Sequence, residues 1–243
     1  VDFENKIVDN DVKIFILCNP HNPVGRVWTK EELVQLGDIC MKHNVIVISD
    51  EIHADFIYPG YEHISFAKLK PEYQSRTITC TSPSKTFNLA GLQVSNIIIP
   101  NPQLKSAFKL ETAKTGFGEL NSMGIIAGQV AYQYGDEWLN DLKQYLLENL
   151  NYLRTYLQEE LPALGLVEPE GTYLVWIDCR NLNLSDTELD SIISEKANLW
   201  LDHGPMFGPE GSGYQRINIA CPREILKKAL RQLKDTLQKE KII

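Results

Sequence analysis

The first half of the chain alternates between short apolar runs and amphipathic stretches. Residues 13–18 and 45–49 are continuous apolar runs, as in strands that are buried on both faces. Between them, Thr29 and Glu32 have the spacing of a helix capping box, and apolar residues then recur at helical intervals as far as His43. This order predicts a strand, a helix and a second strand, with the two strands parallel.

Two more strands are predicted at residues 77–81 and 94–99. They flank a polar loop from Ser82 to Asn88, which we expect at the end of a strand. A parallel sheet whose strands alternate with helices places the first half of the chain in the α/β class.

The second half of the chain has a different pattern. Residues 136–158 place leucines along one face of a helix that is long enough to join two domains. The pattern then predicts strands at 172–177 and 216–220, a helix capped by Ser185 and Glu188, and an amphipathic helix at the end of the chain. We therefore expect a separate α+β unit.

Composition and charge exclude several classes of partner. The 243 residues include 24 basic and 32 acidic side chains, which give a net charge of −8. Nucleic acids and anionic membranes select clustered Lys and Arg, so neither is an expected partner. No apolar run is long enough to cross a bilayer and the first residues lack a signal-peptide layout, so we expect a cytoplasmic protein.

The cysteines favour a structural role. They are widely spaced and none forms a C-x-x-C pair, so they predict neither a zinc site nor a redox site. We expect all of them to be small reduced core residues: Cys18, Cys40, Cys80, Cys179 and Cys221.

Candidate chemistry follows each of the first three predicted strands. Asn22 lies in the loop after the first strand, Asp50 at the end of the second, and Lys85 in the loop after the third. Each alone has an ordinary explanation, such as a Pro-stiffened turn or a solvated lysine. Parallel strands would bring all three residues to the same edge of one sheet, where α/β proteins place their ligands. Coincidence is then the weaker explanation.

A metal site is an alternative at the second strand, because Asp50, Glu51 and His53 are possible ligands. Side chains alternate along a strand, so Asp50 should face away from Glu51 and His53. The pattern therefore disfavours a metal-dependent hydrolase. An unpaired buried carboxylate is costly, so these groups should need partners or a ligand.

These segments resemble the successive signatures of one enzyme family. Asn22 in N-P-H-N-P-V-G, Asp50 in S-D-E-I-H and Lys85 in S-P-S-K-T-F-N are similar to motifs of fold-type I pyridoxal-phosphate enzymes of the class I/II aminotransferase family. Three segments resemble the MalY/PatB branch of cystathionine β-lyases, also called C-S lyases: D-E-I-H-A-D-F, S-K-T-F-N-L-A-G-L and R-I-N-I-A-C-P-R. The similarity covers essentially the whole chain and corresponds to the carboxyl-terminal part of such an enzyme.

The resemblance implies an α/β fold with two domains. Residues 1–135 would form the carboxyl-terminal part of a three-layer large domain of the aspartate aminotransferase type, incomplete at its amino-terminal side. Residues 136–158 would form the interdomain helix, and residues 159–243 a smaller α+β domain.

The resemblance also implies a cofactor, pyridoxal 5′-phosphate, and its ligands. Lys85 would form a Schiff base with the cofactor aldehyde and later carry the Cα proton. Asp50 would pair with the ring nitrogen and keep it protonated. Asn22 would hydrogen-bond the ring hydroxyl, and His53 stands where many relatives carry a Tyr that contacts the same hydroxyl.

Three further residues follow from the same resemblance. Ser82 and Ser84 match positions that donate hydrogen bonds to the cofactor phosphate. Arg216 matches the family arginine that grips the substrate α-carboxylate as a bidentate fork. Gln93 is a departure, because many aminotransferases carry an Arg on the phosphate at this position.

The implied activity is β-elimination of cystathionine or a related cysteine S-conjugate, which gives a thiol, pyruvate and ammonia. Transamination is an alternative that uses Lys85, Asp50 and Arg216 as well. The isolated chain could also be a non-catalytic fragment, because only a dozen residues precede its first strand and the family's amino-terminal portion supplies part of the site. The implied partners are a small amino-acid substrate and a second copy in a homodimer.

Overall fold

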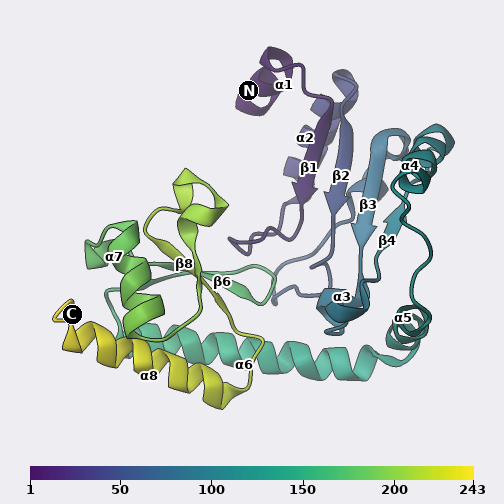
Figure 1. Cartoon of the computed structure of the whole chain (residues 1–243). Helices are drawn as coiled ribbons and strands as arrows, with labels where there is room; N and C mark the ends of the chain where they lie inside the picture. Colours follow the sequence, from purple (N-terminus) through teal and green to yellow (C-terminus); the bar gives the residue numbers. More distant parts are fainter. The chain divides into compact units, whose positions relative to one another are not determined.

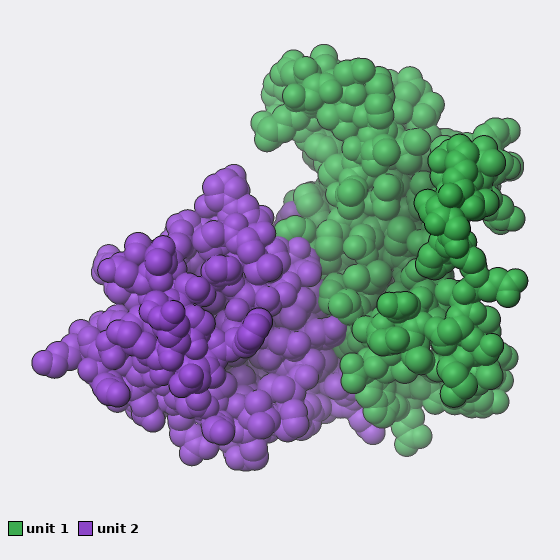
Figure 2. All heavy atoms as spheres, in the orientation of Figure 1, with its two compact units in different colours: residues 1–21, 27–139 green, residues 22–26, 140–243 purple.

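The computed structural model describes all 243 residues as two compact units. Unit 1 comprises Val1–His21 and Val27–Leu139, and unit 2 comprises Asn22–Arg26 and Asn140–Ile243, as coloured in Figure 2. No helix is both long and apolar enough to span a membrane.

Unit 1 is built on a four-stranded sheet with the strand order β1-β2-β3-β4. The strands β1, β2 and β3 are parallel and β4 is antiparallel. The predicted strand, helix and strand are confirmed, and both hydrogen bonds of the Thr29 and Glu32 capping box are present. The strands are β1 (Ile14–Cys18), β2 (Ile46–Asp50), β3 (Thr77–Thr81) and β4 (Asn96–Ile98), and the helices are α1 (Asp2–Asp9), α2 (Lys30–Lys42), α3 (Pro83–Thr86), α4 (Pro102–Lys114) and α5 (Ser122–Tyr134).

The two faces of this sheet are covered unequally. Leu17 and Val47 point to the face on which α2 packs, where they join Leu33 and Tyr73 in the core. The opposite face carries mainly isoleucines, of which Ile14, Ile16 and Ile97 are exposed and Ile46, Ile48 and Ile78 are half-buried. In Figure 1, α2 lies behind the sheet and no helix crosses its near face.

Unit 2 is built on a second sheet with the order β5-β6-β8-β7, in which all neighbours are antiparallel. One face packs on α6 and α8 through leucines that recur at helical spacing. The predicted long helix, the Ser185 and Glu188 cap and the terminal helix are confirmed. The elements are α6 (Asp136–Glu160), β5 (Gly165–Val167), β6 (Leu174–Asp178), α7 (Asp186–Asp190), β7 (Asp202–His203), β8 (Tyr214–Asn218) and α8 (Arg223–Lys239).

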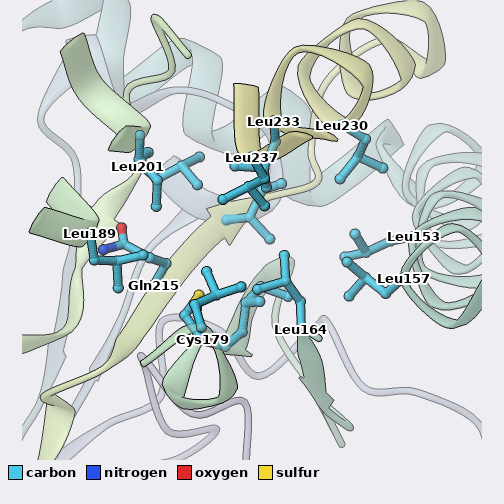
Figure 3. Close-up of a pocket in the computed structure, with 14 residues that line it drawn as sticks. Leu153, Leu157, Leu164, Cys179, Leu189, Leu201, Gln215, Leu230, Leu233 and Leu237 are labelled. Atoms are coloured by element: carbon cyan, nitrogen blue, oxygen red, sulfur yellow. The ribbon is translucent and has the colours of Figure 1, made fainter. Parts of the chain in front are cut away.

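The core of unit 2 encloses a cavity of about 20 Å³. Figure 3 shows Leu153 and Leu157 of α6 facing it, together with Leu230 of α8 and Cys179 and Gln215 from the sheet side. Its volume is near the minimum for one water molecule and its walls are mainly leucine, so it is a packing defect of the core.

The cysteines correct one expectation. All five thiols are free, and Cys40 and Cys179 are buried as predicted. Burial raises the pKa of Cys40 to about 11 and that of Cys179 to about 12, so both thiols stay protonated. The expectation was wrong for Cys18, Cys80 and Cys221, which are half-buried. Cys18 and Cys80 lie on the isoleucine-rich face of the β1–β4 sheet, and Cys221 lies beyond the end of β8.

Candidate functional site

The carboxyl ends of the parallel strands in unit 1 line up across the sheet. Cys18, Asp50 and Cys80 stand opposite one another in register. The N–H of Asn19 donates to the carbonyl of Asp50 at 3.0 Å, and the N–H of Glu51 donates to that of Cys80 at 2.9 Å. The three loops that follow these strands therefore start from one edge of the sheet, as expected for parallel strands.

Asp50 is half-buried on the isoleucine-rich face of the sheet, between the two thiols. Its Oδ1 accepts a hydrogen bond of 3.2 Å from the N–H of Ile52. Burial raises the pKa of the Cys80 thiol, and the negative charges of Asp50 and Glu51 raise it further. The Asp50 carboxylate thus accepts a single backbone hydrogen bond, and its other oxygen can accept from an incoming donor.

Glu51 points to the opposite side of the sheet, where it is buried. Its carboxylate accepts hydrogen bonds from the hydroxyls of Ser49 and Ser65 at 2.8 and 3.2 Å, and from the N–H of Phe66 at 3.1 Å. The Nε2 of His63 lies 3.2 Å away. Burial alone would raise the pKa of Glu51, but the bonds to His63, Ser49 and Phe66 outweigh it and leave the pKa lowered.

The buried Glu51 carboxylate therefore has the hydrogen-bond partners that such a group needs. Apart from Ser49, the partners of Glu51 lie at positions 63–66, a dozen or more residues along the chain, and no local pattern marks them. No group of three His, Cys, Asp or Glu side chains is placed to hold a metal ion.

The loop after β2 is also tied to the segment that carries Lys85. His53 is buried at the start of this loop. Two residues further on, Asp55 accepts a hydrogen bond of 2.6 Å from the hydroxyl of Thr86 in α3. Since Thr86 follows Lys85 directly, the bond fixes α3 beside the loop that follows Asp50 and contains His53.

Ser82 and Ser84 lie at the beginning of α3. Ser82 caps this short helix by accepting from the N–H of Ser84 at 3.0 Å. Both hydroxyls donate to the carbonyl of Val94, at 2.5 and 3.3 Å. They are therefore adjacent and half-buried, and each would have to turn its single O–H away from Val94 to donate to an anion. Gln93, next to Val94, has a left-handed backbone.

Lys85 is exposed and has no hydrogen bond or ion pair within the chain. Its amine is therefore available as a nucleophile once it is deprotonated. Unit 1 thus brings together Asp50, His53, Ser82, Ser84 and Lys85 at one end of its sheet.

Unit 2 carries the other two candidate residues, Asn22 and Arg216, and brings them into contact. The Nη1 of Arg216 donates to the Oδ1 of Asn22 at 2.6 Å. The segment with Asn22 is attached to unit 2 by its Gly25 carbonyl, which accepts from the N–H groups of Glu170 and Gly171 at 2.8 and 2.9 Å. Gly25 has a positive φ of 78°, and a Cβ there would lie only 2.9 Å from Pro169. Glycine is required at this close approach.

Arg216 lies on the face of the β5–β8 sheet opposite to α6 and α8. Its Nε and Nη2 both donate to Oδ2 of Asp202, the first at 3.0 Å. Its guanidinium also lies over the ring of Phe207, 4.8 Å from the centroid. Trp176 stacks on Tyr214 and contacts Phe207 edge-on. This apolar wall shields Arg216 from water and strengthens its interaction with an anion.

Sequence reasoning missed Asp202 and Phe207. Asp202 stands opposite Arg216 because β7 pairs with β8, but β7 is only two residues long and has no hydrophobic pattern of its own. Phe207 lies in the Gly- and Pro-rich loop between these strands. The one signal in the sequence is that Asp202 is an acidic residue just before this loop, and Arg216 lies on the strand that follows it.

The family model for aminotransferase class I and II matches residues 1–233. Cystathionine beta-lyase PatB of Bacillus subtilis is 41% identical over 236 residues, covering 97% of this chain and 61% of the relative. Protein MalY of Escherichia coli is 35% identical, covering 90% of this chain and 56% of the relative.

A solved structure agrees with this match. The crystal structure of cystalysin from Treponema denticola, which contains a pyridoxal 5′-phosphate cofactor, has a TM-score of 0.94 and 37% identity. The match covers 98% of this chain and 61% of cystalysin. The chain thus spans about three fifths of the length of the relatives it matches.

Proposed function

Because the chain belongs to the class I and II aminotransferase family, we propose that the enzyme it represents cleaves cystathionine or a related cysteine S-conjugate with the help of pyridoxal 5′-phosphate. The products are a thiol, pyruvate and ammonia, and one water is consumed. The observation that carries the proposal is the unpaired amine of Lys85 on the sheet edge that also presents Asp50. The similarity to PatB supports a C-S bond as the target.

The residues of unit 1 fit the chemistry of this cofactor. When bound, pyridoxal phosphate supplies an electron sink for the pair of electrons left at the substrate Cα. The Lys85 amine would hold the aldehyde carbon, and the Asp50 carboxylate would hold the proton on the ring nitrogen. The adjacent hydroxyls of Ser82 and Ser84 would turn from the Val94 carbonyl to donate to the phosphate, and His53 would contact the ring hydroxyl.

The remaining residues act on the substrate. Arg216 would bind the α-carboxylate, and Asn22, which accepts from Arg216, would orient it and reach the ring hydroxyl. Lys85 would remove the Cα proton, after which the bond between Cβ and sulfur breaks and the sulfur leaves as a thiol. A homodimer, as the family resemblance implies, is part of the proposal.

The first test is cofactor capture by the 243-residue chain. The chain is mixed with pyridoxal phosphate, its absorbance is recorded, and borohydride reduction is followed by peptide mapping. We expect a label on Lys85 in the chain and none in Lys85→Ala, with Lys114→Ala as a control that removes another exposed lysine. Label spread over many surface lysines would show that these residues alone do not form the site.

Transamination is the second candidate, because the matching family is named for it. The two reactions are separated by supplying cystathionine to a full-length protein that contains this chain, without any keto acid. Pyruvate that accumulates over many turnovers supports elimination. If no pyruvate forms, and an added keto acid is instead converted into its amino acid, the result contradicts elimination.

A further inference from the structure

Arg216 already has a partner at each of its three guanidinium nitrogens. Asp202 accepts from Nε and Nη2, and Asn22 accepts from Nη1. A guanidinium has five N–H donors, so one N–H remains on each of Nη1 and Nη2. Two donors are enough to bind a carboxylate side by side.

The charge of Arg216 is balanced within the chain. The side chain of Arg216 is 15% exposed and that of Asp202 is 35% exposed, so solvent screens this pair only partly. A carboxylate that binds the two remaining donors meets a neutral pair, and it comes close to a second carboxylate. The other oxygen of Asp202, Oδ1, accepts no hydrogen bond and can receive a cationic donor.

We propose that Asp202 is a specificity-determining residue that makes the Arg216 site select zwitterionic α-amino acids over carboxylates that lack an ammonium group. The proposal rests on the function proposed above and deepens it. An amino acid carries both an ammonium and a carboxylate on its α-carbon, so the attraction of Asp202 for the ammonium offsets its repulsion of the carboxylate. A keto acid has only the carboxylate, and Asp202 opposes its binding.

This selectivity bears on the reaction. Elimination needs only an amino acid at Arg216, whereas transamination must also bind a keto acid there. Asp202 therefore biases the site toward elimination.

The test uses the 243-residue chain without cofactor. The NMR signal of the Arg216 Nε–H, which donates to Asp202, is followed during titration with alanine or with pyruvate, two ligands that share a carbon skeleton. In Asp202→Asn, we expect pyruvate to bind about tenfold more tightly and alanine to change by less than about twofold, since only pyruvate is a net anion.

Asp178→Asn is the matched control. Asp178 forms a similar pair with Arg180 in the same unit, whose Nε and Nη2 donate to the Asp178 carboxylate at 2.9 and 2.6 Å. The Asp178→Asn substitution changes the net charge by the same amount as Asp202→Asn. Pyruvate affinity should be unchanged in this variant. Asp202→Ser removes the same charge with a smaller side chain and should reproduce the result if Asp202→Asn folds poorly.

Three outcomes would overturn the proposal: an equal change for both ligands, a weaker affinity for pyruvate, or no response of the Arg216 signal to either ligand in any variant. The result does not depend on turnover. A full-length protein that fails to release pyruvate from cystathionine, while Asp202→Asn gains pyruvate affinity, would refute the lyase proposal and leave the role of Asp202 standing.

Discussion

The sheets of the two units differ in how their faces are covered. The β5–β8 sheet packs one face on α6 and α8 and lines the other with Trp176 and Tyr214 around Arg216. The β1–β4 sheet packs one face on α2 and leaves Ile14 and Ile16, at 53% and 66% exposure, on the other. A contiguous apolar face of this kind is unusual on a soluble monomer.

The difference separates stability from function within one chain. Unit 2 has a closed core, so its free energy of unfolding should depend on leucine packing. Unit 1 carries the proposed cofactor residues at the end of a sheet that has one uncovered face. Its free energy of unfolding should therefore depend more on buried polar contacts such as those of Glu51. Each expectation can be tested by one substitution.

The largest effect is expected in the core of unit 2. Leu153 is fully buried and faces the small cavity, so Leu153→Ala should enlarge the cavity and cost about 2–5 kcal/mol. The loss in free energy of unfolding is measured by urea unfolding, monitored through hydrogen exchange of peptides from α8 and β6. Ile16→Ala, on the bare face of unit 1, should cost less than about 0.5 kcal/mol. Equal losses would contradict the contrast between the two cores.

A smaller effect is expected from the buried carboxylate of unit 1. Glu51→Gln replaces an acceptor of several hydrogen bonds with an amide of the same shape, and should cost about 1–3 kcal/mol. Hydrogen exchange of the Ile52 and Phe66 amides should accelerate with it. Glu4→Gln is the control, because Glu4 also pairs with a histidine, His43, in the same unit. An equal loss of free energy of unfolding in both variants would mean that the buried contacts of Glu51 stabilise unit 1 no more than the more exposed pair of Glu4 does.

The same carboxylate predicts the direction of acid sensitivity. The folded pKa of Glu51 lies below its ordinary value of 4.5, because hydrogen bonds to His63 and Ser49 outweigh the effect of burial. Its stabilisation is therefore complete above about pH 4.5 and is lost as the pH falls through the folded pKa. The urea concentration at the unfolding midpoint of unit 1 should decrease as the pH is lowered below about 4.5. Glu51→Gln should weaken this dependence on pH. An unchanged slope in the variant would count against it.

These elements also show what the sequence could predict. The strands at Ile14–Cys18 and Ile46–Asp50 are continuous apolar runs, and the helix between them has a capping box, so local pattern was sufficient. The helix α4 was missed because it buries no residue and has no apolar stripe. The partners of Glu51 at positions 63–66 were missed because they depend on contacts between distant positions.

The site shows the same division. Asn22, Asp50 and Lys85 could be proposed from the sequence because each lies at or shortly after the end of a strand that the pattern marks. Asp202 could not, because its pairing with Arg216 depends on the register of a strand of two residues. Motifs therefore identified the residues proposed to meet the cofactor, while register determined which group neutralises the arginine.

The smallest effect on stability, and the most direct probe of the bare face, is expected from Ile16→Thr. Ile16 is 66% exposed, so the change should alter the free energy of unfolding by less than about 0.5 kcal/mol. It interrupts the isoleucine face, however, so fluorescence of a bound hydrophobic dye should fall. Val8→Thr is the control, because Val8 is exposed on α1 away from this face. If both variants bind the dye equally, the isoleucines do not act as one apolar surface, and the contrast between the two sheets is limited to their cores.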